Sequence, residues 1–411
     1  MSLSKSSSTA TAGSAGLVGA LAATTTVGYG VLFYAYGVLL LPMERDLGWS
    51  RTVLTGAFTS ALLVCALLTI PVGRWLDGHA PRRLLTSGGA VASVLVGAWA
   101  LVDHPVALFA VWIGLGGCMA LLFYEPAFTI LTKRLRGHER HRAVTKVTLV
   151  AGLATTIFSP LTAVLEDHLG WRGAVVVLAL LLGGITVPLF AIALRPPTDH
   201  PEVVLEHTDT HPREAMRTVQ FWLLTGAYLL TAFTTYAITV HLVPYLRGEG
   251  WTSGHAALAL GSVGLVQVLG RSGFARLTLR RAAGPLGTWV LASKGVGIAA
   301  VIVSPTVGGV VVFLLLYGTA NGLQTLTRAT VIGDLYGAAH YGSISAVVSS
   351  VAAIAGATAP FAMSGAVALV GQDEPVLWGL VALAVASALL NHLAVTQTAS
   401  VGWRSASTSA H

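Results

Sequence analysis

Long apolar stretches, separated by short polar segments, run along almost the entire chain of 411 residues. A membrane-spanning helix needs about 20 consecutive, mostly apolar residues, and stretches of this kind are found with a hydropathy window of about that length. Twelve stretches qualify, at residues 15–41, 52–72, 84–102, 106–131, 143–165, 173–194, 218–246, 254–275, 283–303, 306–331, 342–367 and 375–396. The pattern predicts an all-α integral membrane protein with twelve transmembrane helices.

The low content of charge excludes a soluble protein. Only 10% of the residues are charged and 54% are hydrophobic, whereas soluble domains carry about 25% charged residues. The positive residues behind the net charge of +7 are unevenly distributed along the chain. If both termini are cytoplasmic, 18 of the 24 Lys and Arg residues lie in inner segments and four in outer loops. Positive residues collect on the cytoplasmic side of membrane proteins. We therefore expect a multi-pass protein of the plasma (inner) membrane with both termini cytoplasmic, and no nucleic-acid partner.

A polar segment at 195–217 divides the twelve stretches six and six. We predict a disordered cytoplasmic tail at 1–13, an N-terminal six-helix half at 14–194, a cytoplasmic linker at 195–217, a C-terminal half at 218–397 and a cytoplasmic tail at 398–411. The sequence Leu41-Pro42 with Gly48-Trp49-Ser50 recurs as Val243-Pro244 with Gly250-Trp251-Thr252, at a constant offset of 202 residues. This internal repeat predicts two pseudo-symmetric halves, an arrangement typical of transporters.

Two cysteines, Cys65 and Cys118, lie inside apolar stretches. They have neither the number of a disulfide framework nor the spacing of metal ligands. The histidines of the linker are irregularly spaced in a Pro-rich acidic segment. We therefore expect no metal site and no cofactor, and we interpret the protein as a monomer.

The loop after the second stretch contains a motif, Gly73-Arg-Trp-Leu-Asp77-Gly-His-Ala-Pro-Arg82-Arg83. It resembles the GxxxDRxGxRR signature of the major facilitator superfamily, with Gly78 in place of the first basic residue. The resemblance implies a twelve-helix transporter in which Asp77 caps a neighbouring helix, pairs with cytoplasmic arginines and holds one conformational state. The copy of this motif at 275–281 has Leu279 in place of the aspartate. We therefore expect the interaction that holds the conformational state in the N-terminal half only.

Within that superfamily, the chain is most similar to the monocarboxylate porter and oxalate:formate antiporter branch. The similarity is carried by Tyr124-Glu125-Pro126, by Gly170-Trp171-Arg172 and by 264–271. It implies that Arg271 binds a substrate carboxylate. Gln267 stands where monocarboxylate porters have an acid, and Val38 aligns with their lysine in span 1. Oxalate antiporters use a lysine in span 11, where this chain has none. Drug:proton antiporters have a glycine-rich signature in span 5, and residues 152–160 of this chain match only its terminal proline.

Ionisable groups inside a bilayer are costly, so each one is a candidate for function. Arg271 lies about one and a half helical turns inside Arg276, where it can bind a carboxylate, pair with a protein acid or extend to the headgroups. Glu125 is either a proton-coupling acid or the fixed counter-ion of Arg271 or Arg328. Arg328 is interpreted as a gate residue or as an arginine that extends to the interface.

His241 and Lys294 also lie within predicted spans. His241 can titrate near neutral pH, although a hydrogen-bonded structural histidine is the simpler interpretation. Lys294 falls in span 9, which the resemblance makes peripheral, so we expect it to pack or to extend to the interface, and we place no substrate on it.

Uncharged side chains of spans that line the pathway in this superfamily are further candidates for substrate contact or packing. The sequence gives Tyr34, Tyr36, Tyr124, Tyr236, Asn321 and Gln324. The glycines Gly114, Gly116, Gly117, Gly318 and Gly322 are expected to permit close approach of helices.

Taken together, these features predict a secondary active transporter that moves a small organic solute by alternating access. A carboxylate-type anion is the expected solute, with a proton or a second solute as the coupling partner, as in a symporter. An efflux permease for a drug-like or secondary metabolite is the alternative. A polytopic membrane enzyme is disfavoured because the acidic pairs Glu166-Asp167 and Asp373-Glu374 stand alone in short loops, and no nucleotide-binding loop is present.

Overall fold

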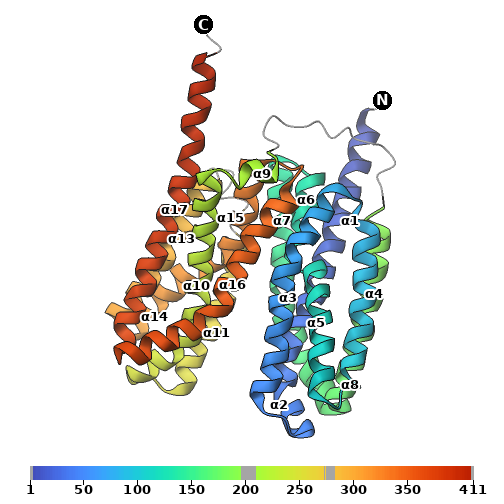
Figure 1. The fold of residues 1–411 in the computed structure, drawn as a ribbon, viewed down its shortest axis with the longest axis vertical. Helices are drawn as coiled ribbons and strands as arrows, with labels where there is room; N and C mark the ends of the chain where they lie inside the picture. Colours follow the sequence, from blue (N-terminus) through green and yellow to red (C-terminus); the bar gives the residue numbers. More distant parts are fainter. Residues whose placement is uncertain (1–2, 196–209, 273, 275–282, 409–411) are drawn as a thin grey trace. The chain divides into compact units, whose positions relative to one another are not determined.

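The computed structural model describes residues 3–195, 210–272, 274 and 283–408. The chain divides into two compact units, Met1–Leu205 and Glu206–His411, and each is a bundle of long helices (Figure 1). The linker predicted at 195–217 lies mostly outside the described residues.

The N-terminal unit contains the first six predicted spans. Its helices are α1 (Leu3–Tyr29), η1 (Gly30–Tyr34), α2 (Ala35–Leu47), α3 (Arg51–Gly78), α4 (Pro81–Trp99), α5 (Pro105–Leu122), α6 (Tyr124–Arg134), α7 (Gly137–Gly152) and α8 (Ala154–Ala193). α1, η1 and α2 form span 1, while α5 and α6 form span 4, which is interrupted at Phe123 by an extended backbone.

Local sequence signals explain several helix ends in this unit. Ser50 is the N-cap of α3 and its hydroxyl accepts from the Val53 amide, while Pro81 and Pro105 occupy the first turns of α4 and α5, where proline is tolerated. In α8, Gly170 has φ 68°, a conformation that strongly favours glycine. It separates spans 5 and 6.

The Gly170-Trp171-Arg172 sequence has a structural explanation. Asp46, near the end of α2, accepts a hydrogen bond from the Trp171 indole nitrogen at 2.8 Å and forms an ion pair with Arg172. The kink at Gly170 thus places two donors against one carboxylate and ties span 1 to span 6.

The C-terminal unit contains the other six spans. Its helices are α9 (Pro212–Ala215), α10 (Val219–Gly248), α11 (Ser253–Ser272), α13 (Ala283–Val303), α14 (Val307–Phe313), η2 (Leu314–Gly318), α15 (Thr319–Tyr336), α16 (Tyr341–Val370) and α17 (Asp373–Thr408). α14, η2 and α15 form span 10. The π-helical segment η2 repeats a feature of the first unit, in which η1 lies within span 1.

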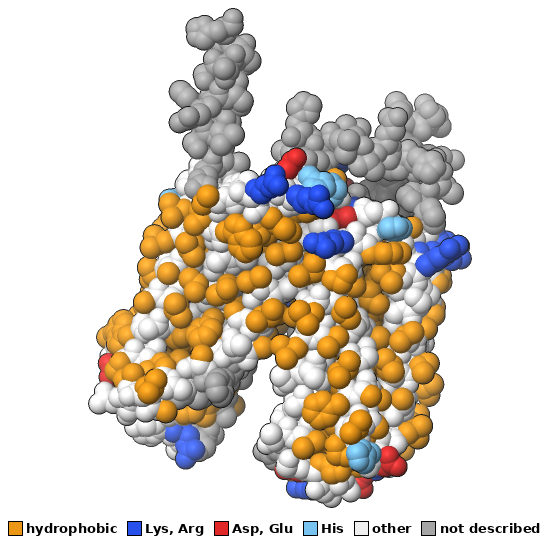
Figure 2. All heavy atoms as spheres, viewed as in Figure 1, with side chains coloured by type: hydrophobic (Ala, Val, Ile, Leu, Met, Phe, Trp, Pro, Cys, Tyr) orange, Lys and Arg blue, Asp and Glu red, His pale blue; other side chains and the backbone are white. Residues whose placement is uncertain are grey.

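The surface fits a lipid environment. On the face that Figure 2 shows, hydrophobic side chains cover the middle of each unit and charged side chains gather near the helix ends. Among the described residues, nine helical stretches are long and apolar enough to cross a membrane, and one of them, Gly137–Ala193, contains both span 5 and span 6.

The ends of the described chain differ from the predicted tails. α1 begins at Leu3, inside the tail predicted at 1–13, and α17 continues to Thr408, inside the tail predicted at 398–411. Both segments lack proline, so the backbone hydrogen bonds of the adjoining span continue into them.

Candidate functional site

Lys294 is the most unusual residue of the C-terminal unit because its side chain is fully buried. It projects from α13 between α10 and α15, where its ammonium group meets side chains of both helices. Of the two expectations for Lys294, packing inside the protein or extension to the interface, the structure shows the buried side chain. The amine of Lys294 points inward because polar side chains of α10 and α15 accept hydrogen bonds from it there.

Four neutral oxygens surround the Lys294 Nζ atom. The hydroxyls of Thr231 and Thr235 lie 3.1 and 2.7 Å away, Asn321 Oδ1 lies 3.1 Å away, and Gln324 Oε1 also accepts from it. The two threonines are four residues apart on α10 and the two amides three apart on α15. Each pair therefore lies on one helix face. We call these five residues the Lys294 cluster.

The hydroxyl hydrogens of the cluster point away from the lysine. Thr235 donates to the Thr231 carbonyl at 2.7 Å, and Thr231 donates to Gln324 Oε1 at 3.3 Å. All four oxygens therefore present lone pairs to Nζ. This arrangement suits a charged ammonium ion, which only donates, and offers no hydrogen to the lone pair of a neutral amine.

The charge of Lys294 is held without an acid. None of the four described side chains that accept from it carries a carboxylate. The Tyr317 ring, with its centroid 5.5 Å from Nζ, adds a cation–π contact. A buried charge is costly unless an opposite charge accompanies it, so the cluster is chemically suited to an anion.

Arg271 and Gln267 lie beside the cluster on α11. Asn321 donates to Gln267 Oε1 at 3.5 Å, and the buried Arg271 donates from Nε to the Gly322 carbonyl at 3.3 Å. Gln267, Asn321 and Gln324 are half-buried. Three predicted candidates, Arg271, Gln267 and Asn321, are thus brought together around one stretch of α15.

Gly322 makes this juxtaposition possible. A Cβ atom there would lie 2.2 Å from the carbonyl oxygen of Gln267, so α11 and α15 approach each other as closely as only glycine allows. The contact supports the expected role of Gly322 in close helix packing.

The tyrosines of the N-terminal unit belong to aromatic packing. Tyr36 is buried, donates to the Leu54 carbonyl and stacks on Phe58. Tyr124 stacks on Phe128 with ring centroids 5.3 Å apart. Tyr34, at the end of η1, meets the Phe33 ring edge-on.

The remaining candidates of the C-terminal unit lie on the helices that hold the cluster. His241 is half-buried on α10, and its Nε2 atom has no hydrogen-bond partner among the described residues. Arg328 is half-buried on α15, seven residues after Asn321. The roles of both as binding or gating residues stay predictions.

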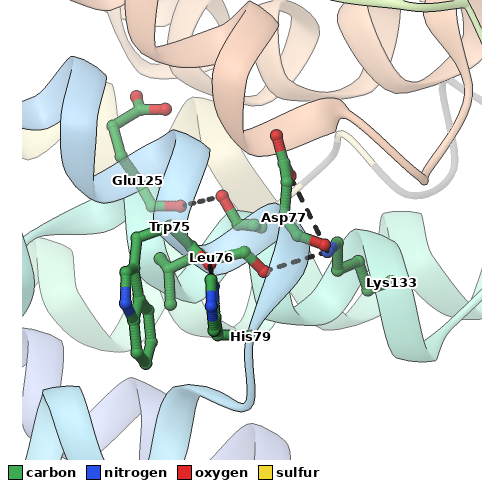
Figure 3. A network of polar contacts seen from close by, with 7 residues as sticks. Trp75, Leu76, Asp77, His79, Glu125 and Lys133 are labelled. Atoms are coloured by element: carbon green, nitrogen blue, oxygen red, sulfur yellow. Dashed lines mark hydrogen bonds and ion pairs between the residues drawn. The ribbon is translucent and has the colours of Figure 1, made fainter.

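In the N-terminal unit, Asp77 of the loop motif contacts Lys133 of α6 (Figure 3). Lys133 Nζ lies 3.8 Å from the Asp77 carboxylate and donates to the backbone carbonyls of Leu76 and Asp77 at 2.9 and 2.5 Å. Arg82 donates instead to the Ala191 carbonyl of α8 at 2.8 Å, and Arg83 lines the same side of α4. Lys133 of span 4 is thus one ion-pair partner of Asp77, and the pairing of Asp77 with cytoplasmic arginines that the resemblance implies stays a prediction.

Glu125 lies in the first turn of α6, directly after the interruption of span 4. Its backbone carbonyl accepts from the Thr129 hydroxyl, and its carboxylate points away from Lys133 (Figure 3). Its pairing with Arg271 or Arg328, and its role in proton coupling, stay predictions.

The sequence offers one signal for a role of Lys294, namely a lysine in the middle of an apolar stretch. Intramembrane charges are by default functional, and the assignment of span 9 to the periphery outweighed that rule. The threonines at 231 and 235 resemble ordinary helix residues, so their part in the cluster required the structure.

The repeated bundles of membrane-spanning helices, together with polar groups buried inside one of them, define a polytopic membrane transporter. The chain belongs to the Major Facilitator Superfamily, whose family model matches residues 16–360. It is thus a transporter of small solutes with twelve transmembrane helices, as predicted, and not an enzyme.

Relatives within this family include anion carriers and an exporter. The chain is 26% identical to an oxalate:formate antiporter of Oxalobacter formigenes (75% of each chain) and 26% identical to monocarboxylate transporter 13 of Bos taurus (74% of this chain, 75% of the relative). It is 29% identical to a chloramphenicol efflux pump of Mycobacterium tuberculosis (85% and 80%). The fold matches that of the transporter FucP in its outward conformation, with TM-score 0.70, 15% identity, and 91% and 98% of the two chains covered. The predicted resemblance to the monocarboxylate and oxalate branch is confirmed.

Proposed function

We propose that the protein carries a small organic anion of the carboxylate type across the membrane by alternating access. The observation that carries this proposal is the fully buried Lys294, whose ammonium group meets only neutral oxygens among the described residues. A carboxylate can replace one of these oxygens and supply the missing negative charge. Arg271, which contacts the same stretch of α15, is the second cationic group available to the solute.

We also propose that the protein lies in the plasma membrane with both termini cytoplasmic. The support is the distribution of Lys and Arg, 18 of 24 in the segments that this orientation places inside. Energy comes from an ion or solute gradient, and proton symport is the form of coupling that we test first.

The test is uptake of radiolabelled lactate, pyruvate and oxalate into proteoliposomes, with and without an inward proton gradient. We expect uptake that the gradient increases and that related acids inhibit. Lys294→Gln keeps a hydrogen-bond donor but removes the charge, and we expect it to lower uptake about tenfold or more, as loss of one charge-assisted bond to a substrate requires.

Ser387→Ala provides a matched control. Ser387 is another buried polar residue of the same unit, and its hydroxyl donates to the Ala227 carbonyl. We expect its loss to leave uptake close to wild type. Full uptake by a folded Lys294→Gln protein would remove Lys294 from the binding site. No uptake of any acid by the folded wild type would refute the carboxylate assignment.

Efflux of a drug-like or secondary metabolite is the second candidate, favoured by the 29% identity to a chloramphenicol efflux pump. It predicts that the wild-type protein lowers accumulation of neutral or cationic compounds in cells and that proteoliposomes fail to take up the acids.

A further inference from the structure

A cavity of about 1060 Å³ opens in the N-terminal unit where α3 ends and α4 begins. Three arginines line it: Arg82 and Arg83 from the first turn of α4, and Arg134 from the last turn of α6. The remaining wall is largely apolar and includes Trp75, Pro81, Ala90, Ala191 and Leu194. We call this cavity the arginine groove.

Among the residues that the structure describes, the arginine groove presents positive charge without an acid in its lining. None of its lining residues is an aspartate or glutamate. Arg82 is oriented by the bond from its Nε atom to the Ala191 carbonyl at 2.8 Å, which leaves its terminal nitrogens for another acceptor. Asp77, the nearest acid in sequence, contacts Lys133 and is not among the lining residues. The start of α4 adds the partial positive charge of a helix N-terminus.

An apolar surface continues from the groove along the same helices. Ser87 and Ala90 line the groove. Val91 and Val94 lie one helical turn beyond Ser87 and Ala90 respectively, and their side chains are 50% and 72% exposed. On α8, Ile192 beside the groove is 60% exposed. In a membrane protein, exposed apolar side chains of this kind face lipid tails.

We propose that the arginine groove binds an anionic phospholipid of the cytoplasmic leaflet. Its phosphate lies against Arg82, Arg83 and Arg134, and one acyl chain follows the apolar surface of α4 and α8. Arginine suits this task because its planar guanidinium binds phosphate oxygens in pairs, and the cytoplasmic leaflet carries the anionic lipids. The proposal uses the orientation given above and is independent of the transported solute.

The test measures lipid retained by the purified full-length protein, using native mass spectrometry after exchange into detergent with phosphatidylglycerol or phosphatidylcholine. We expect the wild type to retain phosphatidylglycerol and not phosphatidylcholine. Replacing Arg82, Arg83 and Arg134 together by Gln is expected to lower that retention about tenfold or more. The matched control replaces Arg136, Arg142 and Lys146 of the neighbouring segment by Gln, which removes the same charge, and is expected to retain the lipid.

A second variant tests the groove without altering charge. Ala90→Trp fills the apolar part of the groove and is expected to reduce phosphatidylglycerol retention while leaving all three arginines. Retention unchanged in both the groove triple variant and Ala90→Trp would overturn the proposal. Equal loss in the control triple variant would also overturn it, since that result means diffuse charge attraction. Displacement of the lipid by millimolar inorganic phosphate alone would show a site for the free anion and not for a lipid.

Discussion

At the scale of single residues, the placement of one side chain depends on what neighbouring helices offer it. Lys294 stays buried because Thr231 and Thr235 on α10 and two amides on α15 present oxygens to it. Gly322 brings α11 against this group by carrying no side chain. The close packing around the site therefore depends on a glycine as well as on polar side chains.

At the residue scale, we predict that Gly322→Ala lowers the stability of the protein. The added methyl would lie 2.2 Å from the Gln267 carbonyl oxygen, so the two helices must separate, at a cost of about 1–3 kcal/mol. We expect a lower Tm in detergent and reduced solute binding.

Gly264→Ala is the control for that change. Gly264 lies on the same helix α11, but a Cβ atom there meets nothing within 4 Å, so alanine is expected to raise the Tm slightly through its better helix propensity. Equal Tm values for the two variants would contradict the close approach at Gly322.

At the scale of elements, the Lys133 side chain ties α6 to the end of α3. Its Nζ atom donates to two carbonyls in the last turn of α3, at 2.9 and 2.5 Å. A cation at a helix C-terminus both satisfies free carbonyls and interacts favourably with the helix dipole. This contact joins span 2 to span 4 within the N-terminal unit.

Lys133→Met is expected to destabilise the N-terminal unit by about 1–3 kcal/mol, because two carbonyls lose a charged donor. The measurement is the Tm of the purified protein, with Lys146→Met as control. Lys146 is exposed on α7, and its loss is expected to change stability by less than about 0.5 kcal/mol. A Tm for Lys133→Met that matches the control would show that the contact contributes nothing to stability.

The sequence predicted the helices well because hydrophobic length is a local property. All twelve predicted spans are recognisable in the described helices, whereas the break in span 4, directly before Tyr124, was not predicted. The contact partners of a side chain are not a local property: neither the position of Lys294 between α10 and α15 nor the contact between Lys133 and Asp77 follows from spacing along the chain. The resemblance pointed to Arg271, Gln267 and Asn321, whereas it placed Lys294 on a peripheral span and gave no sign of its polar partners.

At the scale of the whole molecule, charge distribution predicts the orientation. Fusion of a fluorescent protein that matures only in the cytoplasm to either terminus is expected to give fluorescent cells, because 18 of the 24 cationic residues lie on the side of the termini. A periplasmic phosphatase fused at the same positions is expected to be inactive. The opposite pair of results would invert the topology and place the arginine groove in the outer leaflet.

Under the proposed function, the neutral surroundings of Lys294 determine how voltage acts on transport. An empty Lys294 cluster carries one positive charge, and a bound monocarboxylate cancels it. Moving one elementary charge through a membrane potential changes its energy by about 2.3 kcal/mol per 100 mV. Voltage then acts on the return of the empty carrier, and the loaded step carries only the charge of a coupled ion.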